Sequence, residues 1–309
     1  MKVGVNLINF GPAANPEAFR KTIELSETLG YHLVMTSDHI AITPDVHGRY
    51  PEPFYEPLST LGWLAGITEM EIGSTVIIVP YRHPLETAKA GANIDQLSGG
   101  RLIFGVGVGW AEGEFNVLGV PFNRRGAMTD EYLQAIKALW TQDIASFEGE
   151  FVSFEDIRTT PRPIQEPHPP IWVGGPSDAA IRRAVRYGDA WHPIRISNDQ
   201  FADIDIPKLT RFAEEEGKDV PDLCPRIRLR ITDTPMDNAD RLTGEGTIDQ
   251  IRADLELLQE LGCTYVLLDS YYGDVEATAH HETTWRMLAT VAEKALDLPK
   301  QSVRWVCAR

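Results

Sequence analysis

Strand-like and helix-like segments alternate along the whole chain, and this alternation restricts the folds that it can adopt. Eight strand-like runs are separated by helical patterns. Such alternation is typical of α/β proteins in which helices cover parallel strands. A doubly wound open sheet and a closed (β/α)8 TIM barrel both fit it. The even count of strands and the absence of a GxGxxG turn after the first strand favour the barrel, with loop insertions.

The expected strands are apolar runs, rich in β-branched residues and too short for buried helices. They are Val3–Ile8, His32–Thr36, Gly73–Pro80, Leu102–Gly109, Pro169–Gly175, Asp189–Ile194, Arg226–Thr232 and Thr264–Asp269, with a surface hairpin at Phe147–Ile157. Asn15 and Pro16 begin a helix that Gly30 ends, and Thr247 with Gln250 forms a TxxQ capping box. Because no linker or low-complexity tract interrupts the pattern, we expect one domain over residues 1–309.

The composition limits the partners of the chain. Twenty-nine basic and forty-five acidic residues give a formal net charge of −16, which argues against nucleic acid or an anionic membrane as a main partner. Cys224, Cys263 and Cys307 form no CxxC pair, so a reducing, cytoplasmic setting is expected. The first residues are too short and polar for a signal peptide, and no apolar run approaches the ~20 residues of a membrane helix.

The carboxyl ends of the expected strands carry the residues of chemical interest, because in a barrel they share the face that holds the active site. At the end of the second strand, Asp38 precedes His39. An imidazole titrates near neutrality and can exchange a proton, and a neighbouring carboxylate can orient it. A structural histidine is the alternative. Arg82 and His83, after the third strand, are open to either a surface or a site position.

Glycines mark two further strand ends. Gly105, Gly107 and Gly109 alternate in the fourth strand, which indicates either tight barrel packing or a ligand against the backbone. Gly174 and Gly175 precede a helix with Ser177 as its N-cap, a pattern that suits either a phosphate or a plain tight turn. Two arginines on that helix, Arg182 and Arg183, can add positive charge or lie on the surface.

Several common catalytic devices are missing from the sequence. It contains no HExxH, no metal-spaced His/Cys cluster, no GxSxG elbow and no GxxxxGK loop, so we expect no metal site and no hydrolase built on these motifs. The loop carboxylates are too dispersed to suggest a glycosidase pair.

Taken together, these segments resemble the luciferase-like monooxygenase superfamily, and most closely its coenzyme F420-dependent oxidoreductases. The matching stretches are TSDHI, STVIIVPYRHPLETAKAGANIDQLSGGRLIFGVGVGW, EFNVLGVPFNRRGAMTDEYLQAIKALW, PPIWVGGPSDAAIRRAVRYGDAW and GCTYVLLD. They cover nearly the whole expected barrel in the same order. The resemblance implies a luciferase-like TIM barrel and a flavin-type cofactor.

The resemblance also implies positions for the site. A non-prolyl cis peptide behind the middle cofactor ring is expected at Thr75–Val76, and the cofactor phosphate is expected at the backbone amides of Val108, Gly109, Gly174 and Gly175, beside Ser177. His39 matches a histidine that acts on the substrate proton, with Asp38 beside it. A sugar-phosphate dehydrogenase branch has a glutamate where this chain has Trp110; Glu112 and Glu114 lie nearby but do not match it.

The resemblance therefore implies an F420-dependent oxidoreductase that transfers a hydride between the deazaflavin C5 and a small organic substrate. The alternative within enzymes is an FMN-dependent monooxygenase, and the alternative of another class is a non-catalytic flavin-binding protein. A proton-exchanging histidine disfavours the last of these, because storage requires no proton transfer. Members of the family commonly pair, so a homodimer is expected. The substrate-specificity loops are expected at 40–57 and 197–206.

Overall fold

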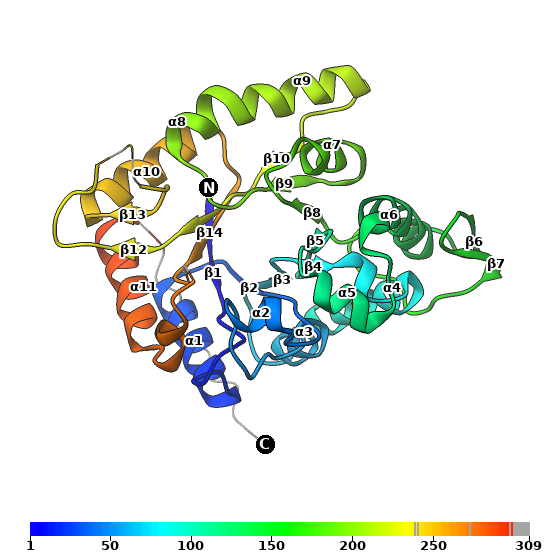
Figure 1. The fold of residues 1–309 in the computed structure, drawn as a ribbon, viewed down its shortest axis with the longest axis horizontal. Helices are drawn as coiled ribbons and strands as arrows, with labels where there is room; N and C mark the ends of the chain where they lie inside the picture. Colours follow the sequence, from blue (N-terminus) through cyan, green and yellow to red (C-terminus); the bar gives the residue numbers. More distant parts are fainter. Residues whose placement is uncertain (238, 240, 272, 297, 299–309) are drawn as a thin grey trace.

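Parallel strands curl into a barrel that helices surround (Figure 1). The computed structural model describes residues 1–237, 239, 241–271, 273–296 and 298. In order around the barrel, the strands are β1 (Lys2–Asn6), β2 (Leu33–Thr36), β3 (Glu71–Ser74), β5 (Leu102–Gly107), β8 (Ile171–Gly174), β9 (Ala190–His192), β10 (Asp222–Leu223) with β11 (Arg226–Arg228), and β14 (Tyr265–Asp269). β14 pairs in parallel with β1. The predicted fold class is confirmed.

The barrel closes because β10 and β11 bridge its two remaining edges. Toward β9, the amide of Arg226 donates to the carbonyl of Pro193 (2.8 Å). Toward β14, the amide of Leu267 donates to the carbonyl of Pro225 (2.9 Å). Proline has no amide hydrogen to donate, and Pro225 is where this strand is interrupted. Its carbonyl still takes part in the pairing.

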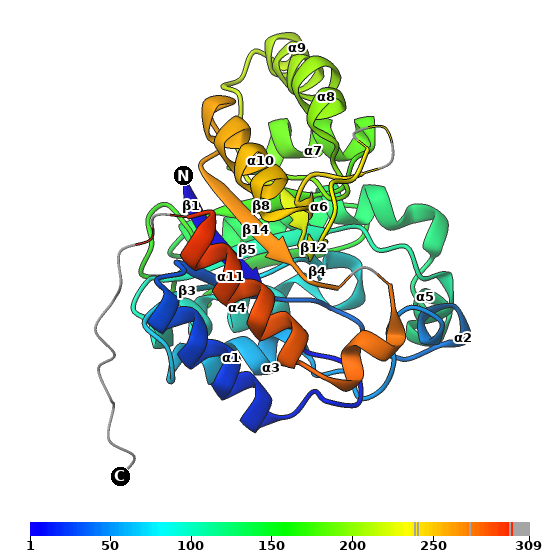
Figure 2. The same ribbon diagram turned by 90° about the vertical axis from the view of Figure 1, so that its left-hand side faces the viewer.

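Eight helices follow the barrel strands along the chain and form the outer layer of the described structure (Figure 2). They are α1 (Pro16–Leu29), α3 (Pro57–Ala65), α4 (Pro84–Ser98), α6 (Arg125–Thr141), α7 (Asp178–Tyr187), α9 (Ile206–Glu216), α10 (Ile248–Glu260) and α11 (Glu282–Lys294). α1 and α11 lie side by side although they come from opposite ends of the chain. Their contact completes the outer layer beside β1 and β14.

The predicted caps are confirmed. The side chain of Asn15 accepts from the amide of Ala18 (2.9 Å), and Gly30 ends α1 with a left-handed φ of 84°. Thr247 and Gln250 form both bonds of the capping box that begins α10. These signals are local, which is why the sequence alone located them.

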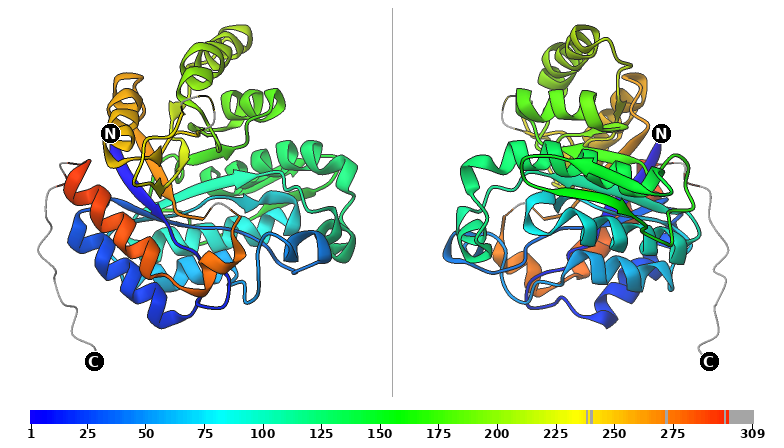
Figure 3. Two further views of the ribbon diagram at one scale, coloured as in Figure 1. Left: turned by 60° about the vertical axis from the view of Figure 1, so that its left-hand side comes forward. Right: turned by 90° about the vertical axis from the view of Figure 1, so that its right-hand side faces the viewer.

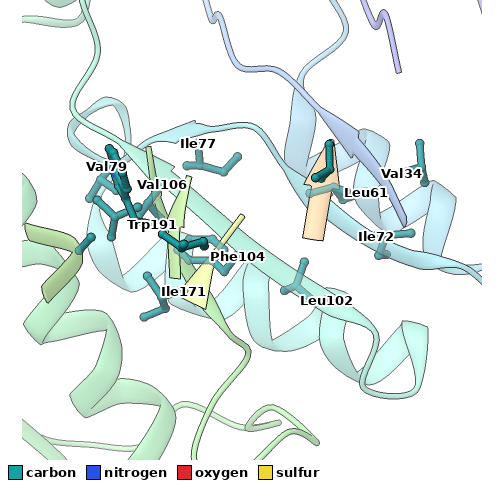
Figure 4. Packing of buried hydrophobic residues seen from close by; sticks show 14 of the residues in the cluster. Val34, Leu61, Ile72, Ile77, Val79, Leu102, Phe104, Val106, Ile171 and Trp191 are labelled. Carbon is teal, nitrogen blue, oxygen red and sulfur yellow. The ribbon is translucent and has the colours of Figure 1, made fainter. Parts of the chain in front are cut away.

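Side chains at alternate strand positions enter two separate cores. The outer core lies between strands and helices and includes Val34, Phe104, Val106 and Ile171 (Figure 4). The inner core fills the barrel and consists of Leu33, Met35, Ile103, Trp172, Ala190, Cys224 and Leu267. Because successive strand residues point to opposite faces, His192 and Asp269, two places beyond Ala190 and Leu267, also point inward. Asn6 on β1 points inward as well, since its neighbour Val5 belongs to the outer core.

Several expected strands differ from the structure, among them the third, the fourth and the seventh. The third is split into β3 and β4 (Ile77–Ile78) around a cis Thr75–Val76 peptide. The fourth ends at Gly107 rather than at Gly109. The seventh begins earlier, at Asp222; its second half becomes β12 (Arg230–Ile231), which leaves the barrel to pair with β13 (Glu245–Gly246).

The insertions are more ordered than expected. The loop after β2 contains α2 (Pro44–His47), the loop after β5 contains α5 (Glu112–Leu118), and residues 198–205 form α8 (Asn198–Gln200) and a π-helical turn. The predicted hairpin is confirmed as β6 (Ala145–Glu148) and β7 (Ser153–Ile157). It projects from the barrel in Figure 1, and the right-hand view of Figure 3 looks onto this side of the molecule. Of the insertions, α5 matters most for the site.

Cys224 and Cys263 are buried free thiols, and burial raises the pKa of both. Cys307 lies outside the described residues. Among the described helices, none has an apolar stretch of the length needed to span a bilayer.

Candidate active site

The carboxyl ends of the strands bring a histidine and a glutamate into contact at the mouth of the barrel. His39, just after β2, places Nδ1 2.5 Å from Oε2 of Glu114 on α5. Both side chains are buried, with 6% and 0% of their surface exposed. The other carboxylate oxygen accepts from the amides of Ile40 (2.7 Å) and Ala41 (3.0 Å), and Tyr81 donates its hydroxyl to Oε2 (2.9 Å).

These donors keep Glu114 ionised. Burial by itself raises its pKa, but the hydrogen bonds from His39 and the two backbone amides outweigh burial and lower the pKa below its usual range. An ionised carboxylate only accepts hydrogen bonds, so Nδ1 of His39 must carry a hydrogen in either charge state. Nε2 is therefore the ring atom at which His39 can gain or lose a proton, and no described residue hydrogen-bonds it.

The expectation that Asp38 orients His39 is wrong. The carboxylate of Asp38 accepts two bonds from Arg82 (2.7 and 2.9 Å) and one from the amide of Ile78 (2.9 Å). Arg82 also bonds Glu56 (2.8 Å). Asp38 therefore ties the end of β2 to the segment after β4, a structural role, and Glu114 takes the position beside the imidazole. Arg82, open to two interpretations in the sequence, belongs to this ion-pair network.

Aromatic rings surround His39. Its ring centroid lies 4.7 Å from that of Tyr50, 5.2 Å from Phe54 and 5.7 Å from Trp110. Tyr50 also packs against Tyr271, from the loop after β14 (5.7 Å). These rings exclude water from one side of the imidazole, which favours a site for an organic molecule.

A layer of polar side chains lies inside the barrel, between the inner apolar core and the carboxyl ends of the strands. Nη1 of Arg226 donates to the carbonyl oxygen of Thr75 (2.9 Å), and Nη2 donates to Asp269 (2.7 Å). Asp269 also accepts from Nδ2 of Asn6 (2.8 Å). The cis peptide expected at Thr75–Val76 is present, and Arg226 holds its carbonyl oxygen. The role of Thr75 and Val76 toward a cofactor stays a prediction.

His192 is a titratable residue of this layer that stays neutral near pH 7. Burial lowers its pKa to about 4. Its Nδ1 lies 2.5 Å from the carbonyl oxygen of Cys224, so Nδ1 carries the hydrogen and donates. Nε2 then accepts from the hydroxyl of Thr75 (2.8 Å), and that hydroxyl in turn accepts from Arg226 (3.2 Å). This chain of bonds fixes the direction of every donor around Thr75.

The expected phosphate-binding glycines lie together at the ends of neighbouring strands β5 and β8. Gly109 and Gly175 have left-handed φ values of 79° and 113°, and neither amide donates to a described residue. Packing explains part of the pattern: a Cβ on Gly107 or Gly174 would lie 2.5 or 2.9 Å from Val76. Val108 is half-buried beside them. These open amides fit an anionic group.

Ser177 begins α7, where its hydroxyl caps the amide of Ala180 (3.2 Å). Arg182 pairs with Glu215 (2.8 Å) and Arg183 with Asp130 (2.5 Å). The charge that faces the glycines instead belongs to Arg125, whose Nε donates to the carbonyl of Gly109 (3.2 Å).

A pocket of about 280 Å³ opens beside the polar layer. Tyr50 and Tyr271 line it, together with Arg226 and Asp269. Its wall therefore includes Tyr50, which packs against His39, and Arg226, which holds the carbonyl oxygen of Thr75. Nearby, the buried Oδ1 of Asn6 has no hydrogen-bond partner among the described residues.

Sequence reasoning missed the role of Glu114 and the polar layer. The sequence showed Glu114 only as a carboxylate near Trp110, and its contact with His39 was not visible because the two residues lie 75 positions apart and Glu114 is on a short helix. The polar layer did offer a signal. Asn6, His192 and Asp269 are polar residues at the ends of otherwise apolar strands, and the last two stand two positions after the inner-core residues Ala190 and Leu267. Within the described residues, no cluster of His, Cys, Asp or Glu suits a metal ion.

The fold and the site together define a closed α/β barrel with a buried histidine–carboxylate pair, an aromatic pocket and glycine-rich strand ends at its mouth. The chain belongs to the luciferase-like monooxygenase family, whose model matches residues 1–241.

Relatives of known and unknown activity share parts of the sequence. Protein Rv0953c of Mycobacterium tuberculosis, named as uncharacterized, is 34% identical over 199 residues, which cover 60% of this chain and 70% of the relative. The FMNH2-dependent dimethylsulfone monooxygenase of Pseudomonas putida is 39% identical over 132 residues, 42% of this chain and 36% of that enzyme. Among solved structures, the coenzyme F420-dependent tetrahydromethanopterin reductase of Methanopyrus kandleri superposes with a TM-score of 0.75 at 18% identity, covering 95% of this chain and 98% of that one. At that identity the likeness shows the fold alone.

Proposed function

We propose that the protein is an F420-dependent oxidoreductase that acts on a small organic substrate. The observation that carries the proposal is the buried His39–Glu114 pair, which leaves Nε2 as a proton-exchanging atom beside an aromatic pocket. When bound, the deazaflavin supplies a hydride acceptor or donor at its C5. Oxidation of an alcohol or reduction of a carbonyl also requires a proton to move at the substrate oxygen, and His39 is placed to move it.

The remaining residues would bind and orient the cofactor and the substrate. The amides of Gly109 and Gly175, with Ser177 at the start of α7, would hold the cofactor phosphate, and Arg125 adds a nearby positive charge. Thr75 and Val76 would contact the ring system. Arg226 and His192 hold Thr75 in place. Arg226 hydrogen-bonds its carbonyl and hydroxyl oxygens, and His192 accepts from the hydroxyl. The rings of Tyr50 and Trp110 exclude water from the substrate side.

The cofactor assignment is tested by titration. Purified protein is titrated with F420 and, separately, with FMN, and quenching of cofactor fluorescence gives each Kd. We expect F420 to bind in the micromolar range or tighter, and FMN at least about tenfold more weakly, a difference of ~1.4 kcal/mol. Binding of FMN alone, with oxygen consumed during turnover, would establish the second candidate instead.

That second candidate is an FMN-dependent monooxygenase. It is favoured by the 39% identity to the Pseudomonas putida monooxygenase over 132 residues. The same glycines suit the phosphate of FMN as well as that of F420, because both groups are phosphate esters. The two candidates therefore differ in the ring that occupies the site and in the need for oxygen, and both are read out by the titration and an oxygen electrode.

A further inference from the structure

We propose that the pocket at the barrel mouth is an anion site, and that the substrate carries a carboxylate or phosphate group. Four arginines line this pocket of about 280 Å³: Arg49, Arg195, Arg226 and Arg228. They gather in a chain whose formal net charge is −16. A concentration of positive charge against that background is a local feature of the pocket, not a consequence of composition.

Two of the arginines are neutralised within the protein. Arg226 pairs with Asp269 (2.7 Å) and Arg228 with Glu245 (3.1 Å). Arg49 and Arg195 form no ion pair with a described carboxylate. The guanidinium of Arg49 instead lies 4.9 Å from the ring centroid of Trp110. The pocket therefore keeps an excess of two positive charges, which a ligand anion can neutralise.

The backbone conformation of Arg195 also supports a binding site. Arg195 has a φ of 56°, in the left-handed region that residues other than glycine seldom adopt. Such conformations cluster at binding sites, where the surrounding structure holds them. Arg195 lies three residues after His192, the last residue of β9, so this conformation occurs in the loop that leaves the polar layer.

The position of the pocket assigns the anion to the substrate. Its wall includes Tyr50, whose ring lies 4.7 Å from that of His39. The phosphate-compatible glycines follow β5 and β8, and no pocket-lining residue comes from those two strands or the loops after them. A small molecule with its anionic group at Arg49 and Arg195 therefore lies next to Tyr50, one of the rings that pack around His39. Assignment to a substrate rests on the proposed hydride-transfer function; binding of an anion does not.

The test uses benzoate and its neutral isostere benzamide on protein without cofactor. Isothermal titration should show benzoate binding at least about tenfold more tightly than benzamide, with a preference that weakens as salt rises. The double variant Arg49→Gln/Arg195→Gln should lose the preference, and Arg49→Lys/Arg195→Lys should retain most of it. Arg211→Gln is the matched control, because it removes one exposed positive charge on α9 and should behave as wild type.

Two results would overturn the proposal. If wild type binds both probes equally, or the Gln double variant keeps the preference, the pocket is no anion site. A cofactor titration of the same double variant separates substrate from cofactor. F420 and FMN affinities should stay within a few-fold of wild type, whereas a tenfold loss would assign the arginines to the anionic tail of the cofactor.

Discussion

Nδ1 of His39 and Oε2 of Glu114 lie 2.5 Å apart in a buried contact between the end of β2 and helix α5. The carboxylate fixes the hydrogen on Nδ1 and so leaves proton exchange to Nε2. The contact with Glu114 therefore fixes both the orientation and the tautomer of the His39 ring. It also makes Glu114 a positioning residue whose effect can be separated from that of His39.

Replacing Glu114 by Gln should reverse the tautomer of His39. The amides of Ile40 and Ala41 require an oxygen, so the new NH2 group faces Nδ1 of His39. Nδ1 must then accept, and the hydrogen moves to Nε2. We expect kcat to fall about 10²–10⁴-fold, with cofactor affinity within a few-fold and a changed ring ¹⁵N shift. Tyr81→Phe, which leaves the His39 contact intact, should cost less than about tenfold.

His39→Ala separates an enzyme from a binding protein. If Nε2 exchanges the substrate proton, turnover should slow about 10²–10⁴-fold while F420 and FMN affinities change only a few-fold. His39→Asn should recover little, because an amide does not take up a proton near neutral pH. The assay first screens aldehydes, alcohols and enones with either redox state of the cofactor. Wild-type turnover in the Ala variant would leave His39 a structural residue.

Local signals explain what the sequence predicted well. Asn15, Gly30 and the Thr247–Gln250 box act within one helical turn, so each helix end is visible in a few consecutive residues. The barrel was predicted from eight strand-like runs, each followed by a helical pattern. The split of the third strand was not visible in its apolar pattern, and only the family resemblance indicated the peptide between Thr75 and Val76.

Partners across the barrel explain what the sequence missed. Asp38 stands next to His39 in the sequence, but its carboxylate bonds Arg82, which lies 44 residues away. Glu114 reaches His39 only because α5 folds back over the mouth. Sequence adjacency therefore suggested the wrong carboxylate, whereas the histidine itself was identified.

Ser177→Asp tests the phosphate site without weakening the fold. Aspartate is as good an N-cap as serine and suits the positive end of the helix, so α7 should remain stable. Its charge should repel a phosphate at Gly175 and lower cofactor affinity at least about tenfold. Ser177→Asp is a more specific test than a substitution of Gly175, because the φ of 113° at Gly175 strains any replacement.

The control for the phosphate site is Asn15→Asp. It adds the same charge at the N-cap of α1, far along the chain from the glycines. Fluorescence titration should show wild-type affinity in this control. Equal affinity in Ser177→Asp and Asn15→Asp would remove the start of α7 from the cofactor site.

Arg226→Met should destabilise the protein, because it leaves Asp269 as a buried charge that keeps only its bonds from Asn6 and the amide of Tyr271. The two ion-paired side chains are 13% and 10% exposed. Breaking one side of such a pair costs about 3–5 kcal/mol. Urea unfolding should show this loss, and adding Asp269→Asn should recover part of it. Strictly additive losses would contradict the coupling of the two residues.

Stability should fall with acid because of His192. Burial lowers its folded-state pKa to about 4 from 6.5, so between those values the unfolded chain binds a proton that the folded protein excludes. The stabilising effect is complete above pH 6.5 and is lost as the pH falls to 4, by about 3 kcal/mol. His192→Asn keeps a donor for the carbonyl of Cys224 but does not titrate. Urea unfolding at pH 7.5 and pH 4.5 should therefore show a smaller acid-induced loss in the variant than in the wild type. An equal loss in both proteins would mean that other groups account for the acid sensitivity and that His192 is not held neutral by the fold.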